Sequence, residues 1–294
     1  ASPAQLSIMV NGRLRTVLEL LNTAPLYILD RADQKADIAD GEAKIEVDVT
    51  FPIKSGLAAH DVSTSATGEI LHFATSDLFN KHSIFGKKVI LDLTPASLIL
   101  RGITEYKGID LDTEFKFDFE TGEYSFLAGL DIDQKLIDSF TIPIPSGVIS
   151  GSAPADLKVV FPKKERASFS LESDLLGAAL RLDQFDWKKS QDTVVDLSID
   201  GYFENGLIFD NLSVTGAGLQ LWAGPQTSWN KSQSSFKFKK FSIYENIDVT
   251  GSVGSDGSFE ITKGYFDARP HLFTSNQSKM PPRKNLYGRV ALDK

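Results

Sequence analysis

Apolar and polar residues alternate along most of this chain, which is the period of a β-strand with one buried face. The clearest case is GEAKIEVDVTFP, from Gly41 to Pro52, in which four of the five polar positions between the apolar ones are charged. We expect a single strand whose apolar side chains share one dry face. Those side chains are Ala43, Ile45, Val47, Val49 and Phe51.

A second pattern predicts a β-hairpin. LDTEFKFDF and YSFLAGLDI both alternate, and the turn residues TGE separate them. If the two strands pair antiparallel around this turn, their apolar side chains lie on one face. The first strand contributes Leu111, Phe115, Phe117 and Phe119, and the second contributes Tyr124, Phe126, Leu130 and Ile132.

The remaining segments also alternate apolar and polar residues, and Gly, Asn, Asp and Ser occupy the turns between them. Phe236 and Phe238 in FKFKKF are assigned to the same kind of dry face. The pattern gives roughly fifteen consecutive strands, more than an open twisted sheet holds without curling or splitting. The predicted fold is therefore mainly β: a long antiparallel meander, curled into a U-shaped trough or an elongated open sandwich, with a few short helices.

Three stretches carry helix signals. The strongest lies in GRLRTVLELLNTAPLYILDRADQ, where Leu14, Val17, Leu18 and Leu21 recur at helical spacing and Asn22 with Pro25 ends the pattern. ATSDLFNKH, residues 74–82, is a weaker candidate for a short helix capped by Thr75 or Ser76. DQKLIDSF, residues 133–140, is a third.

One stretch offers a possible boundary. Residues 141–156, TIPIPSGVISGSAPAD, are rich in Pro, Gly and Ser, which fits a domain linker and equally fits a loop with an edge strand. We predict two β-groove segments, 1–140 with an N-terminal helix and 141–294, or one continuous domain. The abrupt opening ASPAQLSIMVNGRL leads us to expect a segment of a longer protein, with any membrane anchor outside it.

Composition narrows the function classes. A net charge of −8 and a pI near 5.1 weigh against nucleic acid, which rewards clustered Lys and Arg. The chain has no cysteine, which excludes disulfides and thiolate metal sites. Its 20 Phe residues indicate a large apolar surface, since Phe fills apolar space without needing a hydrogen-bond partner.

Candidate chemistry is sparse. The four histidines show no HExxH or H-x-H spacing. We therefore assign no metal site to His72 and His82. The carboxylates Asp110, Asp112 and Glu114 share the wet face of a strand, which explains them without catalysis. We therefore predict no catalytic residues, no metal, no cofactor and no enzyme activity. A carbohydrate-active protein, with Trp222 or Trp229 beside paired carboxylates, remains a third hypothesis.

Three motifs resemble one known family, in order along most of the chain. They are VLELLNTAPLYILDRADQKADIADGEAKIEVDVTFPI at 17–53, SLESDLLGAALRLDQFDWKKS at 170–190, and GYFDARPHLF at 264–273. The first resembles the central domain of AsmA-like envelope proteins of Gram-negative bacteria, and the others resemble the region that follows it. The order of the three motifs along the chain carries the resemblance to this family.

The resemblance implies a periplasmic protein anchored in the inner membrane, in a superfamily whose curled sheets form an apolar groove for lipid. Partners would be acyl chains, mainly phospholipid, together with envelope proteins. A lipid with about thirty methylenes would lose on the order of 20 kcal/mol on full exposure to water, so crossing an aqueous gap needs apolar cover. The alternative is a structural or assembly β module of the envelope, with a fully packed core.

Overall fold

Two compact units make up the chain in the computed structural model: residues 1–130 with 158–165, and residues 131–157 with 166–294. Each is described by itself. The protein is mainly β, with a long antiparallel sheet that is not closed into a barrel, which confirms the predicted fold class. The structure describes residues 3–23, 27–31, 34–54, 61–79, 82–140, 142, 144, 146–204, 207–224, 227–229, 235–254, 259–267 and 288–290.

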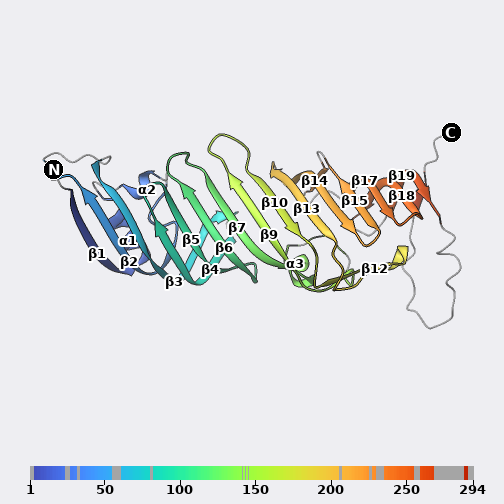
Figure 1. Ribbon diagram of the computed structural model, residues 1–294, viewed down its shortest axis with the longest axis horizontal. Helices are drawn as coiled ribbons and strands as arrows, with labels where there is room; N and C mark the ends of the chain where they lie inside the picture. The colour runs from blue at the N-terminus through green and yellow to red at the C-terminus, as the bar shows by residue number, and fades with distance from the viewer. Residues whose placement is uncertain are drawn as a thin grey trace. The chain divides into compact units, whose positions relative to one another are not determined.

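The first unit is an antiparallel meander in which each strand pairs with the next one along the chain (Figure 1). Its strands are β1 (Ala4–Arg13), β2 (Asp40–Phe51), β3 (Ser63–Phe79), β4 (His82–Leu93), β5 (Ser97–Tyr106), β6 (Ile109–Asp118) and β7 (Tyr124–Ile132). Strand β9 (Ala153–Phe161) has residues in both units.

Strand β2 behaves as its alternation predicts. Ala43, Ile45 and Val47 are buried, whereas Glu42 and Lys44 are exposed. The contrast fades toward the end of the strand, where residues 48–51 are all half-buried. The dry face of β2 is therefore best defined in its first half.

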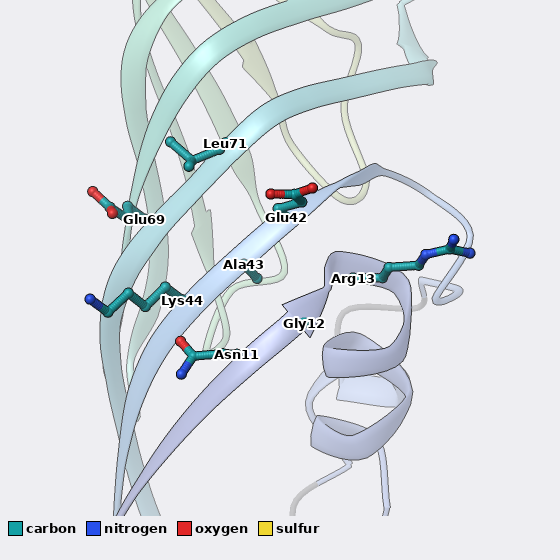
Figure 2. Close-up of a pocket in the computed structure, with 8 residues that line it drawn as sticks. All are labelled: Asn11, Gly12, Arg13, Glu42, Ala43, Lys44, Glu69 and Leu71. Atoms are coloured by element: carbon teal, nitrogen blue, oxygen red, sulfur yellow. The ribbon is translucent and has the colours of Figure 1, made fainter.

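Helix α1 (Leu14–Leu21) covers that dry face. Leu14, Val17 and Leu21 are buried and pack in one cluster with Ile45 and Ile70. Figure 2 shows α1 beside β1 and β2, on the side opposite the side chains of Lys44 and Glu69. The helix ends where the sequence predicts, with Asn22 as its C-cap. Asn22 also bonds Asp30 of the short helix α2 (Ile28–Arg31).

The predicted hairpin is confirmed. Strands β6 and β7 pair antiparallel, with Phe117 opposite Tyr124 and Phe115 opposite Phe126. Asp118 holds the turn, because its carboxylate accepts hydrogen bonds from the backbone N–H groups of residues 120 and 121. These bonds, chiefly the one from Thr121, lower the pKa of Asp118.

The second unit has the same main design with a smaller sheet added. Its main strands pair antiparallel, apart from the parallel pair β19–β20. They are β10 (Ser168–Ser173), β13 (Asp196–Phe203), β14 (Leu207–Gly216), β15 (Leu219–Ala223), β16 (Thr227–Trp229), β17 (Ser235–Ile243), β18 (Ile247–Gly254), β19 (Phe259–Phe266) and β20 (Gly288–Val290). The small sheet consists of β8 (Ile149–Gly151), β11 (Ala178–Leu182) and β12 (Trp187–Lys189), with the 3-10 turn η2 (Asp183–Phe185) between the last two.

Trp187 joins the small sheet to the main one. It is almost fully buried and packs with Phe238 and Phe241 of β17, and its indole N–H donates to the carbonyl of Ala217 at 2.9 Å. The buried Lys189 lies two residues further along β12. The small sheet therefore covers part of the main sheet's apolar face, as α1 does in the first unit.

Lys189 binds three backbone carbonyls, two of them at the start of β11 and just before it. Its ammonium donates to the carbonyl oxygens of Leu175 at 2.6 Å and Ser190 at 3.2 Å, and also to that of Ala178. Burial lowers the pKa of Lys189, while the carboxylates of Asp174 and Asp192 act in the opposite direction. The side chain serves as an internal clamp.

The weaker helix predictions have different outcomes. Residues 133–140 do hold a helix, α3 (Gln134–Ser139), whose N-cap Asp133 accepts from the N–H of Leu136 at 2.8 Å. The prediction over 74–82 is wrong, because β3 continues as a strand to Phe79 and β4 begins at His82. The alternation of Phe73 and Thr75, both buried, continues after a register shift and outweighs the capping signal.

We expect Gly68→Ala to destabilise the protein by about 2 kcal/mol, within the range for overpacking a core. A Cβ there would lie 2.3 Å from the Lys44 carbonyl oxygen and 2.7 Å from the Ile45 Cα. Gly12→Ala is the matched control, since its Cβ meets nothing within 4 Å. Urea denaturation of both variants checks this, and equal midpoints would contradict the packing described for β2 and β3.

We expect Lys189→Met to cost about 2–4 kcal/mol, because it keeps the apolar stem and leaves buried carbonyls without their donor. Its exposed neighbour provides the control: Lys188→Met should change the free energy of unfolding by less than about 0.5 kcal/mol. The measurement is chemical denaturation at neutral pH. If Lys189→Met were as stable as wild type, the ammonium would not be the clamp.

Candidate functional site

An unbroken row of apolar side chains crosses the first unit. The pairing registers join Ile8, Val47, Ala66, Leu93, Leu98, Phe117 and Tyr124 on one face, strand by strand from β1 to β7. The adjacent row joins Val10, Ile45, Gly68, Leu91, Leu100, Phe115 and Phe126. At about 4.8 Å per strand, each row follows roughly 30 Å of sheet. This apolar face is the candidate functional site.

The two ends of these rows differ in cover. On β2, β3 and β4 the side chains belong to the cluster under α1 and form an ordinary packed core. At the other end, Tyr124 lies on the same face and is 37% exposed. Its ring stacks on that of Phe161, with centroids 5.1 Å apart, and lies 6.3 Å from those of Phe115 and Phe117. At the far end of the face the ring of Tyr124 is therefore exposed, whereas Phe117 and Phe126 beside it are buried.

The second unit repeats this division. Under the small sheet, Trp187 and its neighbours form a packed core. Away from it, Phe169 contacts the rings of Phe203 and Phe209 at centroid distances of 5.2 and 6.1 Å, and Phe209 lies 6.3 Å from Phe236. Phe203 is 42% exposed. An aromatic surface is again left partly open beside a covered core.

The residues predicted to line a groove fall into both kinds of environment. Those buried under α1 are Ala43, Ile45 and Val47, with Val49 and Phe119 half-buried at the edge of that cluster. Those at the aromatic end are Phe115, Phe117, Tyr124 and Phe126. Leu111 is buried and Phe51, Leu130 and Ile132 are half-buried; in the second unit Phe238 is buried and Phe236 half-buried.

Sequence reasoning missed several members of this face. Leu98 and Leu100 of β5 belong to the two rows, but the run SLIL is apolar at three consecutive positions and does not reveal its inner side. Phe161 was not assigned, although its strand was predicted. The β1 side chains Leu6 and Ile8 alternate with polar residues, and that signal was available in QLSIMVN.

The candidate metal-binding and carboxylate residues lie in ordinary surface environments where the structure describes them. Among the described residues, no cluster of three or more His, Asp or Glu side chains could hold a metal ion. Asp110 and Asp112 are exposed, and Glu114 pairs with Arg101 at 2.6 Å. Trp222 is exposed with the Lys239 ammonium over its ring at 5.2 Å, whereas the side chain of Trp229 lies outside the described part.

Two shallow hollows lie away from the apolar face. The one in Figure 2, about 350 Å³, is lined by residues at the end of β1, near the start of β2 and in the middle of β3, including Asn11, Lys44 and Glu69. Glu69 already pairs with Lys88 at 2.6 Å, and that hydrogen bond lowers the pKa of Glu69. The second hollow is lined by carboxylates such as Asp156 and Glu172. Both hollows are shallow and lined by a mixture of polar and apolar residues.

Comparison with known proteins adds no relative. In the described part of the chain, the helices are too short or too polar to cross a membrane. No protein-family model matches the sequence, and searches of curated proteins and of solved structures find no match. The apolar face is therefore the feature of the molecule from which a function is inferred.

Proposed function

We propose that this protein is a non-enzymatic part of a lipid-carrying β-groove in a bacterial envelope. In this proposal the apolar face of each unit shields the acyl chains of a lipid, preferentially a phospholipid, between inner and outer membranes. The protein would act in the periplasm of a Gram-negative bacterium, joined to the inner membrane by an anchor outside these residues and helped by envelope proteins. This role follows the resemblance to AsmA-like proteins.

The observation that carries the proposal is the partly exposed aromatic surface. Tyr124 and Phe203 lie on the apolar faces of their units, yet each keeps more than a third of its surface exposed. Ordinary cores bury such side chains, because each exposed apolar side chain forgoes roughly 1.5–3 kcal/mol of burial. An acyl chain lying on these rings would recover part of that free energy.

The chemistry of the face also suits a mobile cargo. The two rows from β1 to β7 contain no charged residue, and the hydroxyl of Tyr124 is the one polar side-chain group in them, so they offer little that would fix a lipid in one position. The charged side chains of β2 lie on the opposite face, toward water. A lipid could therefore be sheltered and still slide.

A second candidate function is a structural or assembly module of the envelope. The clusters under α1 and around Trp187 favour it, since both are cores of buried side chains packed against one another. Val47→Asp would consequently test folding more than lipid binding, because Val47 lies in the first of these cores. Variants at exposed inner positions separate the two candidates.

We expect Tyr124→Asp to weaken binding of a dansyl-labelled fatty acid at least tenfold, because a carboxylate on this face must be desolvated when an acyl chain covers it. The matched control is Leu127→Asp, in the same strand but on the opposite face, where Leu127 is 40% exposed. Its affinity should stay within twofold of wild type. The measurement is a fluorescence titration.

Native mass spectrometry of the purified wild-type chain tests independently whether phospholipid co-purifies with it. Thermal unfolding of Tyr124→Asp shows whether the variant keeps its fold. If wild type binds neither the fatty acid nor co-purified lipid, or if both variants bind equally well, the lipid proposal is wrong and the packed module is favoured.

A further inference from the structure

The outer face of the second unit carries a strip of lysine and aromatic side chains. It lies on β15, β17 and β19, on the side of the sheet away from the packed cluster around Trp187. Figure 1 shows these strands and β18 next to one another within the unit. The members of this basic strip are Trp222, Lys237, Lys239, Lys240, Lys263 and Tyr265.

The pairing registers gather three of the lysines beside the tryptophan. Trp222 of β15 lies opposite Lys240 of β17. A register shift in β17 sets both Lys239 and Lys240 against Thr250 of β18, and the Thr250 hydroxyl donates to the Lys239 carbonyl at 3.0 Å. Thr250 pairs in turn with Lys263 of β19. Residues that pair across strands share a face, so these side chains form one row.

This strip is exposed and carries an excess of positive charge. Trp222 is 43% exposed and Tyr265 54% exposed. Lys240 is half-buried, and the other three lysines are exposed. Among the described residues of these strands, the carboxylates on the same face are Asp248 and Glu260. Four lysines against two carboxylates leave a basic surface on a chain whose net charge is −8.

The four lysines are also available to a partner. In the part of the chain that the structure describes, none of them takes part in an ion pair. The first unit shows the contrast, because Lys88 pairs with Glu69 and Arg101 pairs with Glu114. Salt screens charges beyond about 8 Å at physiological ionic strength, so distant carboxylates oppose an anionic partner of the strip only weakly.

The aromatic side chains select among anionic partners. A sugar ring or a nucleobase would stack on a face of Trp222, and the Lys239 ammonium already lies over that ring at 5.2 Å. A bilayer surface needs no free ring face, because Trp and Tyr lie at the level of the lipid headgroups. Lysines beside such rings add attraction to anionic headgroups. The composition of the strip therefore favours an anionic membrane surface.

We propose that the basic strip docks the second unit onto an anionic phospholipid bilayer. The lysines contact lipid phosphates, and Trp222 and Tyr265 lie at headgroup level. This contact uses the outer face of the sheet, whereas the proposed lipid-carrying function uses the apolar face. The two proposals can therefore fail separately.

Co-sedimentation of the purified chain with vesicles tests the docking. We expect binding to vesicles of equal parts phosphatidylglycerol and phosphatidylcholine, and binding at least tenfold weaker to phosphatidylcholine alone. Added salt should weaken binding to the anionic vesicles, because it screens the attraction between lysines and phosphates.

Charge-reversal variants locate the contact. Lys239→Glu combined with Lys240→Glu should weaken binding to the anionic vesicles at least tenfold. The matched control is Lys163→Glu combined with Lys164→Glu, two adjacent exposed lysines of the first unit, which changes the net charge of the chain equally. Binding of the control should stay within twofold of wild type. Thermal unfolding shows whether each variant keeps its fold.

A second set of variants avoids the half-buried Lys240. Lys237→Glu combined with Lys263→Glu changes two exposed residues and should also weaken binding at least tenfold. Trp222→Ser keeps every charge and should weaken binding at least threefold at high salt, where the aromatic contact remains. Tyr124→Asp should leave vesicle binding within twofold of wild type, which separates this proposal from the lipid-carrying one.

Four results would overturn the proposal. They are equal binding to anionic and neutral vesicles, equal effects of the strip and control variants, no effect of Trp222→Ser, and binding of heparin or single-stranded DNA as tight as that of the vesicles. The last result would assign the strip to a soluble polyanion.

Discussion

Strand register is the constraint on which this structure depends. A slip of one residue would move every apolar side chain of a strand to the wet face. From Ile8 on β1 to Tyr124 on β7, six successive pairings keep the apolar side chains aligned. Where the register does shift, as between Thr75 and Phe79, the pairing resumes as an antiparallel ladder. The continuous apolar face follows from this alignment.

An apolar face of this size costs free energy in water unless other residues or a ligand cover it. In each unit a small element takes part of it: α1 in the first, and β8, β11 and β12 in the second. These covers rely on specific devices, the close approach of Ile45 to Gly68 and the clamp formed by Lys189. Outside these covers the apolar faces carry aromatic side chains, of which Tyr124 and Phe203 are exposed. That remainder makes a lipid role physically reasonable, while the covered parts limit where an acyl chain could lie.

The lipid hypothesis has a simple physical basis. Apolar surface left in water costs free energy that contact with apolar atoms recovers. Tyr124 in the first unit and Phe203 in the second are exposed rings on the apolar faces, and an acyl chain would supply such atoms.

The sequence alone determined strand β2 and the hairpin of β6 and β7, because period-two alternation and the turn TGE are local signals that neighbouring strands reinforce. It also located α1, through the helical spacing of Leu14, Val17 and Leu21. It could not show that α1 would cover Ile45, that Trp187 would reach Phe238, or that Leu98 faces inward. It wrongly favoured a helix over 74–82, where pairing with β4 outweighs local capping signals. Only the tertiary structure decided which parts of the apolar face are closed, because cover depends on contacts between residues far apart in the chain.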